Sequence, residues 1–426
     1  MSDFAFLHDN IERSLKKGAQ YADIFIQSGE SHSVHFEDGK IDSISSATSD
    51  GAGSRVISDG KTFYAHSPGK SEASVSDSFA ECAASAGMGD FARSDSPSPL
   101  LDAEEPITPP AADFFREIDE TIRKESKYIR QSSYRFSVSH KRVLIVMPDG
   151  RTAFDRRFYT SFTAQVVAER DGLVQTGSER RCMSITEKDF WCEKAPLEVA
   201  RSALRRALLM LDARPCPAGT MNVLLDGEAG GTIIHEACGH GLEADIVEKD
   251  YSVYRGRIGE KVAHESVTMV DDAQMPGLYG AYLFDDEGTP AQRTVLIENG
   301  VLKGYLTDVL SSMLYDMPRT GNGRRESYRS IPVPRMSNTF LIPGSDDFED
   351  MLARTENGLY VKKMGGGEVD PTSGDFVFFV SEGYLVEKGR VGAPVRGAIL
   401  TGNGPDALSK ISALGKNLIM DPGICG

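Results

Sequence analysis

The chain has 426 residues, of which 40% are hydrophobic and 26% are charged, as in ordinary globular proteins. This length exceeds that of a usual single domain, so we expect two or three domains. The formal net charge of −16 disfavours nucleic acid and anionic membranes as partners, because both carry negative charge themselves.

Residues 1–93 are predicted to form an N-terminal α+β domain. The first twenty residues lack the basic start, the apolar run and the cleavage site of a signal peptide. Apolar residues then recur at helical and strand spacings, and Asp59-Gly60 is typical of a type I′ turn. The predicted elements are a helix (4–18), a strand (21–30), a hairpin turning at Glu37-Asp38-Gly39 (32–46), a second hairpin (53–67) and a helix (71–87).

Residues 94–113 contain five prolines and are predicted to be a linker, because dense proline disfavours both helix and sheet. The segment 114–220 is predicted to be a central α+β domain. Its expected elements, in order, are a helix (114–128), three strands (134–147, 158–172 and 173–185) and a long helix (197–211).

The segment 221–426 is predicted to be strand-rich, and it is rich in glycine. The motif Met221–Asp226 reads as a buried strand, and hairpin turns are expected at 298–300 and 387–389. Further strands are expected in 276–286, 293–310, 376–391 and 394–400. The predicted fold class is therefore α+β, with an N-terminal α/β domain followed by a strand-rich C-terminal domain. No stretch approaches the roughly eighteen apolar residues of a membrane span.

The run "HEACGH" places His235, Glu236 and His240 within six residues. On an ideal α-helix, residues five apart point about 140° from each other, so their side chains do not meet at one ion. A π-bulge would correct this, and so would unwinding at Gly239 and Gly241, which flank His240. The sequence therefore predicts a metal site on a distorted helical turn.

Zinc sites of peptidases use neutral imidazoles as ligands and keep one position open for water. Glu236 follows the first histidine and is the candidate general base for that water. Glu243 and Asp245 are expected to support the ligands or to face solvent. The third ligand is not apparent from the local sequence.

Six cysteines are scattered along the chain (Cys82, Cys182, Cys192, Cys216, Cys238 and Cys425). In a chain of this length, such spacing is typical of free thiols in a reducing compartment rather than of a disulfide framework. We therefore expect a cytoplasmic protein.

"HEACGHGLEAD" resembles the H-E-A-x-G-H-G-L-E-x-D signature of the TldD/PmbA family of zinc metallopeptidases. Further blocks are similar to that family in the same order (254–265, 285–306, 320–344, 365–387 and "MDPGICG" at the end). The intact H-E-x-x-x-H motif resembles the active, TldD-like type. The resemblance implies one Zn²⁺ per active subunit, held by His235, His240 and Cys425, with Cys238 as a packing residue. The family usually continues beyond this cysteine, whereas this sequence ends at Gly426.

The resemblance implies a metallopeptidase that cleaves unfolded or extended peptides, working as a homodimer or as a heterodimer with a related subunit. An exposed strand edge near the metal would bind such peptides by strand addition. Two alternatives stay open: a zinc amidohydrolase acting on a small amide, and a non-catalytic peptide-binding subunit. Candidate groups for substrate carbonyls or the oxyanion lie in 320–338, where a salt-bridged loop or a subunit interface is the alternative. They are Arg324, Tyr328, Arg335 and Asn338.

Overall fold

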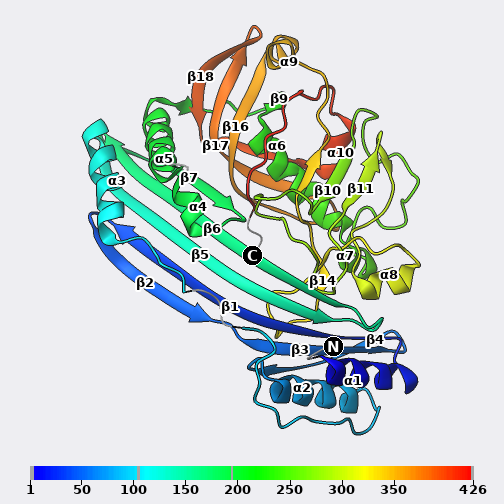
Figure 1. Cartoon of the computed structure of the whole chain (residues 1–426). Coiled ribbons are helices and arrows are strands. Elements are labelled where there is room, and N and C mark those ends of the chain that lie inside the picture. The colour runs from blue at the N-terminus through cyan, green and yellow to red at the C-terminus, as the bar shows by residue number, and fades with distance from the viewer. Residues whose placement is uncertain (1–3, 103–105, 193–194, 424–426) are drawn as a thin grey trace.

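The structure is a computed structural model that describes residues 4–102, 106–192 and 195–423. It contains extensive helix and sheet, which confirms the predicted α+β class. A long, curved seven-stranded sheet runs beneath the C-terminal half of the chain (Figure 1). Its strand order is β4-β3-β1-β5-β6-β7, with β2 paired to β1. The strands are β1 (Tyr21–Glu37), β2 (Lys40–Thr48), β3 (Gly51–Ser58), β4 (Lys61–Pro68), β5 (Ile129–Val146), β6 (Thr152–Arg170) and β7 (Leu173–Met183).

Strand β1 joins the first two predicted domains into this one sheet. Its antiparallel register with β5 runs from Ile24 opposite Val146 to Glu37 opposite Ser133. The first half of β1 also pairs with β3, and its second half pairs with β2. The segments 1–93 and 114–220 therefore share a sheet. The division into 1–93, 94–113, 114–220 and 221–426 stays a prediction.

Helices cover one face of the sheet. Successive side chains of β1 alternate between the two faces, and Ile24 and Phe36 belong to the cores beneath these helices. Helix α5 lies close to β7, since a Cβ atom at Gly177 would come within 2.1 Å of the Ala203 carbonyl oxygen. The helices of this part are α1 (Ala5–Lys16), α2 (Glu72–Ser85), α3 (Ala112–Glu125), α4 (Glu187–Cys192) and α5 (Ala195–Asp212).

The opposite face of the sheet packs against the C-terminal region. Phe25 of β1 and Val143 of β5 share a small core with Tyr328. Buried ion pairs lie at the same contact: Arg55 of β3 binds Asp23 of the neighbouring strand β1 and, across the contact, Glu287 of the C-terminal region. The contact therefore combines apolar packing with charges that are removed from water.

The C-terminal region is built from three small sheets with short helices between them. In the six-stranded sheet the order is β8-β18-β17-β16-β9, with β19 paired to β17, and in the four-stranded sheet it is β12-β11-β10-β15. The strands are β8 (Arg214–Pro215), β9 (Asn222–Leu225), β10 (Met269–Asp272), β11 (Arg293–Glu298), β12 (Val301–Leu302), β13 (Gly323–Arg324), β14 (Val333–Pro334), β15 (Thr339–Leu341), β16 (Gly358–Val369), β17 (Asp375–Glu387), β18 (Arg390–Arg396) and β19 (Ile399–Asn403). The helices are α6 (Gly227–Ile234), α7 (Ala244–Glu248), α8 (Val309–Tyr315), α9 (Phe348–Thr355) and α10 (Gly404–Ser409).

The predicted hairpin turns are confirmed. Each turn contains a positive-φ residue followed by a glycine of positive φ, which is the backbone that a tight hairpin requires. These pairs are Asp38-Gly39, Asp59-Gly60, Asn299-Gly300 and Lys388-Gly389.

Three strand predictions in the C-terminal region are wrong in whole or in part. In the segment 293–310, β11 and β12 form, but strand ends at Leu302 and α8 begins at Val309. Strand β9 forms as expected, but Asn222 and Val223 are exposed because β9 lies at the sheet edge and pairs in parallel with β16 alone. The segment 276–286 contains no strand, since turn hydrogen bonds form there instead; one joins the amide of Ala281 to the carbonyl of Leu278. Helix α3 also begins at Ala112, two residues before the predicted start.

Candidate metal centre

The H-E-x-x-x-H motif lies on a helix that changes its winding. Asp226 caps α6 by accepting a hydrogen bond from the Gly227 amide at 2.7 Å. Helix α6 ends at Ile234, and the five residues after it, His235–Gly239, form a π-helical turn. The backbone amide of His240, at the end of this turn, donates a hydrogen bond to the carbonyl of His235. A short 3₁₀ turn, His240–Leu242, follows. Of the two expected distortions, a π-turn is therefore the one that the chain uses.

The π-turn brings the two imidazoles onto one side of the helix. Their ring centroids lie 4.9 Å apart, with the ring planes at 82°. One ligand atom each from His235, Glu236 and His240 falls within a mutual distance of 4.8 Å. All three side chains are half-buried, so the cluster is open to a cavity. Two imidazole nitrogens at this separation are the donor set that zinc prefers.

A buried carboxylate orients the second histidine. Nδ1 of His240 lies 3.1 Å from Oε2 of Glu243, whose side chain is only 2% exposed. Glu243 also accepts a hydrogen bond from the Met336 amide at 3.4 Å and pairs with Arg335 at 3.3 Å. A carboxylate that is hydrogen-bonded to one ring nitrogen of a histidine fixes the orientation of the ring, and so the direction in which the other ring nitrogen points. Carboxylates support metal-binding histidines in this way.

Burial keeps the first histidine in the form that binds a metal. Burial, with a smaller contribution from His240, lowers the pKa of His235 to about 4. At neutral pH its imidazole is therefore neutral and has a lone pair to donate. Cys238, inside the motif, is fully buried in the core, and burial raises the pKa of its thiol to about 12. Its sulfur therefore stays protonated and packs as an apolar group.

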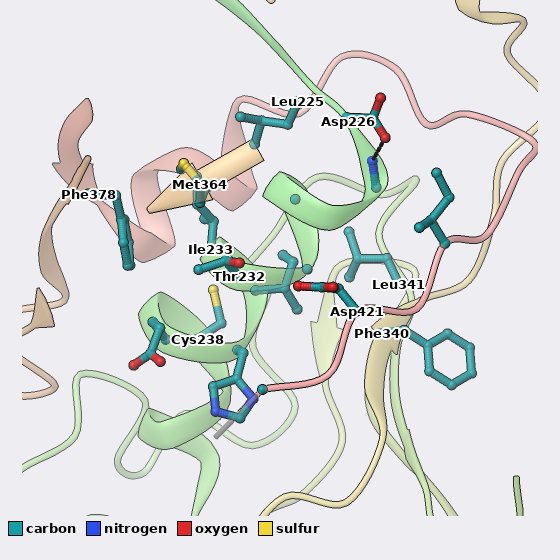
Figure 2. Close-up of a pocket in the computed structure, with 18 of the residues that line it drawn as sticks. Leu225, Asp226, Thr232, Ile233, Cys238, Phe340, Leu341, Met364, Phe378 and Asp421 are labelled. Atoms are coloured by element: carbon teal, nitrogen blue, oxygen red, sulfur yellow. Dashed lines mark hydrogen bonds between the residues drawn. The ribbon is translucent and has the colours of Figure 1, made fainter. Parts of the chain in front are cut away.

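The predicted third ligand, Cys425, lies outside the described residues. The chain before it runs along the same cavity as the motif, because Asp421, Pro422 and Gly423 all line that cavity. Figure 2 shows Asp421, Phe340, Leu341 and Cys238 in this lining. The segment is anchored by Arg180, which donates a hydrogen bond of 2.6 Å to the Pro422 carbonyl.

The cavity is large enough for a peptide. Its volume is about 3300 Å³, and its walls come from the seven-stranded sheet, from α6 and the π-turn, and from β9, β15 and β16. Two of these strands, β9 and β15, lie at the edges of their sheets.

None of the helices in the described ranges combines the length and the apolar character needed to cross a membrane.

Comparison with known proteins matches the whole length of this architecture. The models of the three domains of one protein family match this sequence in order. They are PmbA/TldA metallopeptidase domain 1 at residues 22–87, the central domain at 97–211 and the C-terminal domain at 218–425. A "Metalloprotease TldD homolog" of Haemophilus influenzae is 36% identical over 96% of this chain and 89% of its own. The chain belongs to the PmbA/TldA metallopeptidase family. The resemblance predicted from the sequence is thereby confirmed.

Two further similarities refine this PmbA/TldA assignment. A "Zinc metalloprotease TldD homolog" of Saccharolobus solfataricus is 32% identical over 54% of this chain and 51% of its own. The crystal structure of TldE from Thermococcus kodakarensis superposes with a TM-score of 0.75 at 19% identity, covering 97% of this chain and 94% of that one. At that identity the superposition establishes a shared fold.

The four predicted substrate groups of this PmbA/TldA chain occupy different places. Arg324, Arg335 and Asn338 line the cavity, whereas Tyr328 is absent from its lining among the described residues. Tyr328 is buried against the sheet, and a Cβ atom at Gly51 would come within 2.3 Å of its ring.

Arg335 and Asn338 already have protein partners. Arg335 pairs with Glu243 and Asp245 at 3.3 and 3.4 Å. The side-chain amide of Asn338 joins a loop to the end of β10: its oxygen accepts a hydrogen bond from the Gly280 amide at 3.2 Å, and its nitrogen donates one to the Asp272 carbonyl at 2.8 Å. Both residues therefore shape the cavity wall.

Sequence reasoning missed the cavity residues that come from the long sheet. Lys141 of β5, with Arg157 and Tyr159 of β6, lines the cavity. Lys141 lies directly opposite Arg157 in the β5–β6 ladder, so both side chains leave the same face of the sheet. Strand alternation places each residue on one of two faces, but the identity of the face that meets the motif depends on the tertiary fold.

Proposed function

We propose that this chain is a zinc-dependent peptidase that hydrolyses unfolded or extended peptides. One observation carries the proposal: the π-turn gathers His235, Glu236 and His240 within 4.8 Å on the wall of a peptide-sized cavity. His235 and His240 would hold the ion together with Cys425, whose thiolate is a good zinc ligand. The name of the Saccharolobus relative supports zinc as the metal.

Zinc in such a site polarises the scissile carbonyl and lowers the pKa of a bound water to about 7. Glu236 would accept a proton from the attacking water and return it to the leaving amine. Its carboxylate lies 3.7 Å from Nε2 of His240 and is about one-third exposed, so it can reach both the metal and the cavity. Glu243 would hold His240 in its ligating orientation, as its 3.1 Å contact supports.

The strand edges on the cavity wall favour an extended substrate. Strand β15 pairs with β10 on one side, and its residues Thr339–Leu341 line the cavity. An extended peptide could add to this edge through backbone hydrogen bonds, which read the main chain and not the side chains. Folded substrates would be excluded because their backbone groups are already paired.

We place the chain in the cytoplasm, as a homodimer or as a heterodimer with a related subunit. The cysteines Cys82, Cys182, Cys216 and Cys238 are free, which suits a reducing compartment. The shared fold with TldE makes a related subunit a reasonable partner. The negative net charge argues against nucleic acid and anionic membranes as partners.

The dependence of cleavage on substrate length tests the proposal against its alternatives. We expect the purified, zinc-loaded chain to cleave an unstructured oligopeptide much faster than a dipeptide amide of the same scissile bond, and to leave a folded protein that contains the sequence intact. Mass spectrometry of timed digests would measure this. Equal or faster turnover of the small amide would favour a zinc amidohydrolase, whereas cleavage that requires an added second subunit would favour a non-catalytic binding role.

A further inference from the structure

Two cations from distant parts of the chain face the cavity. Lys141 leaves the long sheet on the face that meets the C-terminal region, and Arg324 lies in β13. Both line the same cavity as the metal-binding motif, together with Tyr159. The ammonium group of Lys141 lies over the ring of Phe25 at 5.5 Å, and the guanidinium of Arg324 lies over Tyr282 at 4.9 Å. Aromatic faces therefore support both cations.

The neighbouring arginines are already neutralised by carboxylates. Arg157 binds Asp286 at 2.7 Å and Asp155 at 3.1 Å, and it donates to the Phe284 carbonyl at 2.8 Å. Arg325 binds Asp23 at 3.0 Å. Each of these two guanidinium groups is thus paired with at least one carboxylate of the protein.

Lys141 and Arg324 lack such partners. Among the described residues, neither side chain donates a hydrogen bond or forms an ion pair within 4.0 Å, and Nε of Arg324 is buried without an acceptor. Tyr159 beside them packs its ring on Tyr279, and its hydroxyl has no hydrogen bond within the same ranges. Both cations are half-buried, and a charge partly removed from water without a hydrogen-bonded counter-charge is unfavourable, so this arrangement favours the binding of an anion at these groups.

The titration of Lys141 agrees with this geometry. Burial lowers the pKa of Lys141 to about 8; Asp286 opposes the shift, while Arg157, Arg324 and Arg325 add to it. The guanidinium groups of these three arginines therefore repel the ammonium group of Lys141, and the attraction of the Asp286 carboxylate does not fully offset the shift. An incoming anion would remove part of this repulsion.

We propose that Lys141 and Arg324 form a carboxylate-binding subsite that anchors the peptide substrate in the cavity. This inference rests on the proposed peptidase function, because a peptide contributes carboxylates as its anions. The planar fork of Arg324 suits a bidentate carboxylate, Lys141 adds a point charge, and the Tyr159 hydroxyl can donate a further hydrogen bond. The carboxylate comes from the C-terminus of the peptide or from an acidic side chain.

Peptide binding to the zinc-loaded Glu236→Gln protein tests the subsite without interference from hydrolysis. The probes are one fluorescent oligopeptide as the free acid, the same peptide as its C-terminal amide, and the amide with one Gln replaced by Glu. We expect the uncharged amide to bind at least about tenfold more weakly than one of the carboxylate-bearing forms, since hydrogen bonds to a charged group are involved. Weaker binding of the amide than of the acid identifies the C-terminus as the source, and restoration by Glu identifies a side chain.

Adding Lys141→Met or Arg324→Gln should remove this difference while leaving metal content and thermal unfolding unchanged. Lys40→Met, which removes a charge from the exposed first residue of β2, should preserve the difference. The subsite is refuted if all three peptides bind equally well to the parent protein, or if both cavity variants keep the discrimination. If the Glu236→Gln protein discriminates between the peptides but the zinc-loaded wild-type chain cleaves none of them, the subsite is retained and the peptidase is rejected.

Discussion

Replacing Glu236 with glutamine is expected to lower peptide turnover by about 10²- to 10⁴-fold, the usual contribution of a general base. Glutamine keeps the size of the side chain but cannot accept a proton from water at neutral pH. The metal should remain bound, because the proposed ligands are His235, His240 and Cys425. Loss of turnover with retained metal separates proton transfer from metal binding.

Single-turnover rates and the zinc content of the same preparation would measure this effect. Glu248→Gln is the matched control, since Glu248 is an exposed glutamate on the neighbouring helix α7. The control should cleave peptides at the rate of the parent protein. Unchanged turnover in Glu236→Gln would show that another group handles the proton.

The second large effect concerns stability. Arg55→Met is expected to lower the free energy of unfolding by about 3–5 kcal/mol at a pH above about 8, where Glu287 is ionised; this is the range for breaking a buried ion pair. Arg55 is 1% exposed; it binds Asp23 and lies 2.7 Å from Glu287. Methionine fills much of the same space but leaves both carboxylates without this cation. Arg325 still serves Asp23, so most of the loss falls on Glu287.

The loss should grow with pH. Burial raises the pKa of Glu287 from 4.5 to about 8, and Arg55 opposes this shift. A carboxyl group with a raised folded-state pKa contributes stability that is complete below its unfolded pKa and is lost as the pH rises through its folded-state pKa. Without Arg55 this pKa rises further, so the deficit of the variant should increase as the pH passes about 8.

Denaturant unfolding at several pH values would measure both effects. Arg130→Met removes an arginine from the exposed pair with Glu169 and should cost about 1 kcal/mol or less. Equal losses in Arg55→Met and Arg130→Met would contradict the view that the buried pairs hold the sheet against the C-terminal region.

Local pattern was sufficient to predict a distorted helical turn at the H-E-x-x-x-H motif. The five-residue spacing of His235 and His240 is incompatible with a regular helix and a shared ion, so the sequence alone required a distortion there. The choice of a π-turn over unwinding at glycine came from the structure. Hairpin turns were equally local, because Asp59-Gly60 and similar pairs set their own backbone geometry.

Features that depend on tertiary contacts were not predictable. Strand β9 was expected to be buried from its apolar residues, but its exposure follows from its place at the edge of a sheet, which local sequence does not encode. Lys141 and Arg324 stand 183 positions apart in the chain, and only the packing of the long sheet on the C-terminal region puts them in one cavity. Cys425 remains a prediction from family resemblance.

Metal content is the most direct test of the proposed centre. Zinc should be measured by mass spectrometry in the parent protein, His240→Ala, Cys425→Ala and the control Cys238→Ala, whose sulfur is buried in the core. We expect about one zinc ion per chain in the parent and the control, and loss of zinc in the other two variants. Full zinc occupancy in Cys425→Ala would contradict the proposed ligand set.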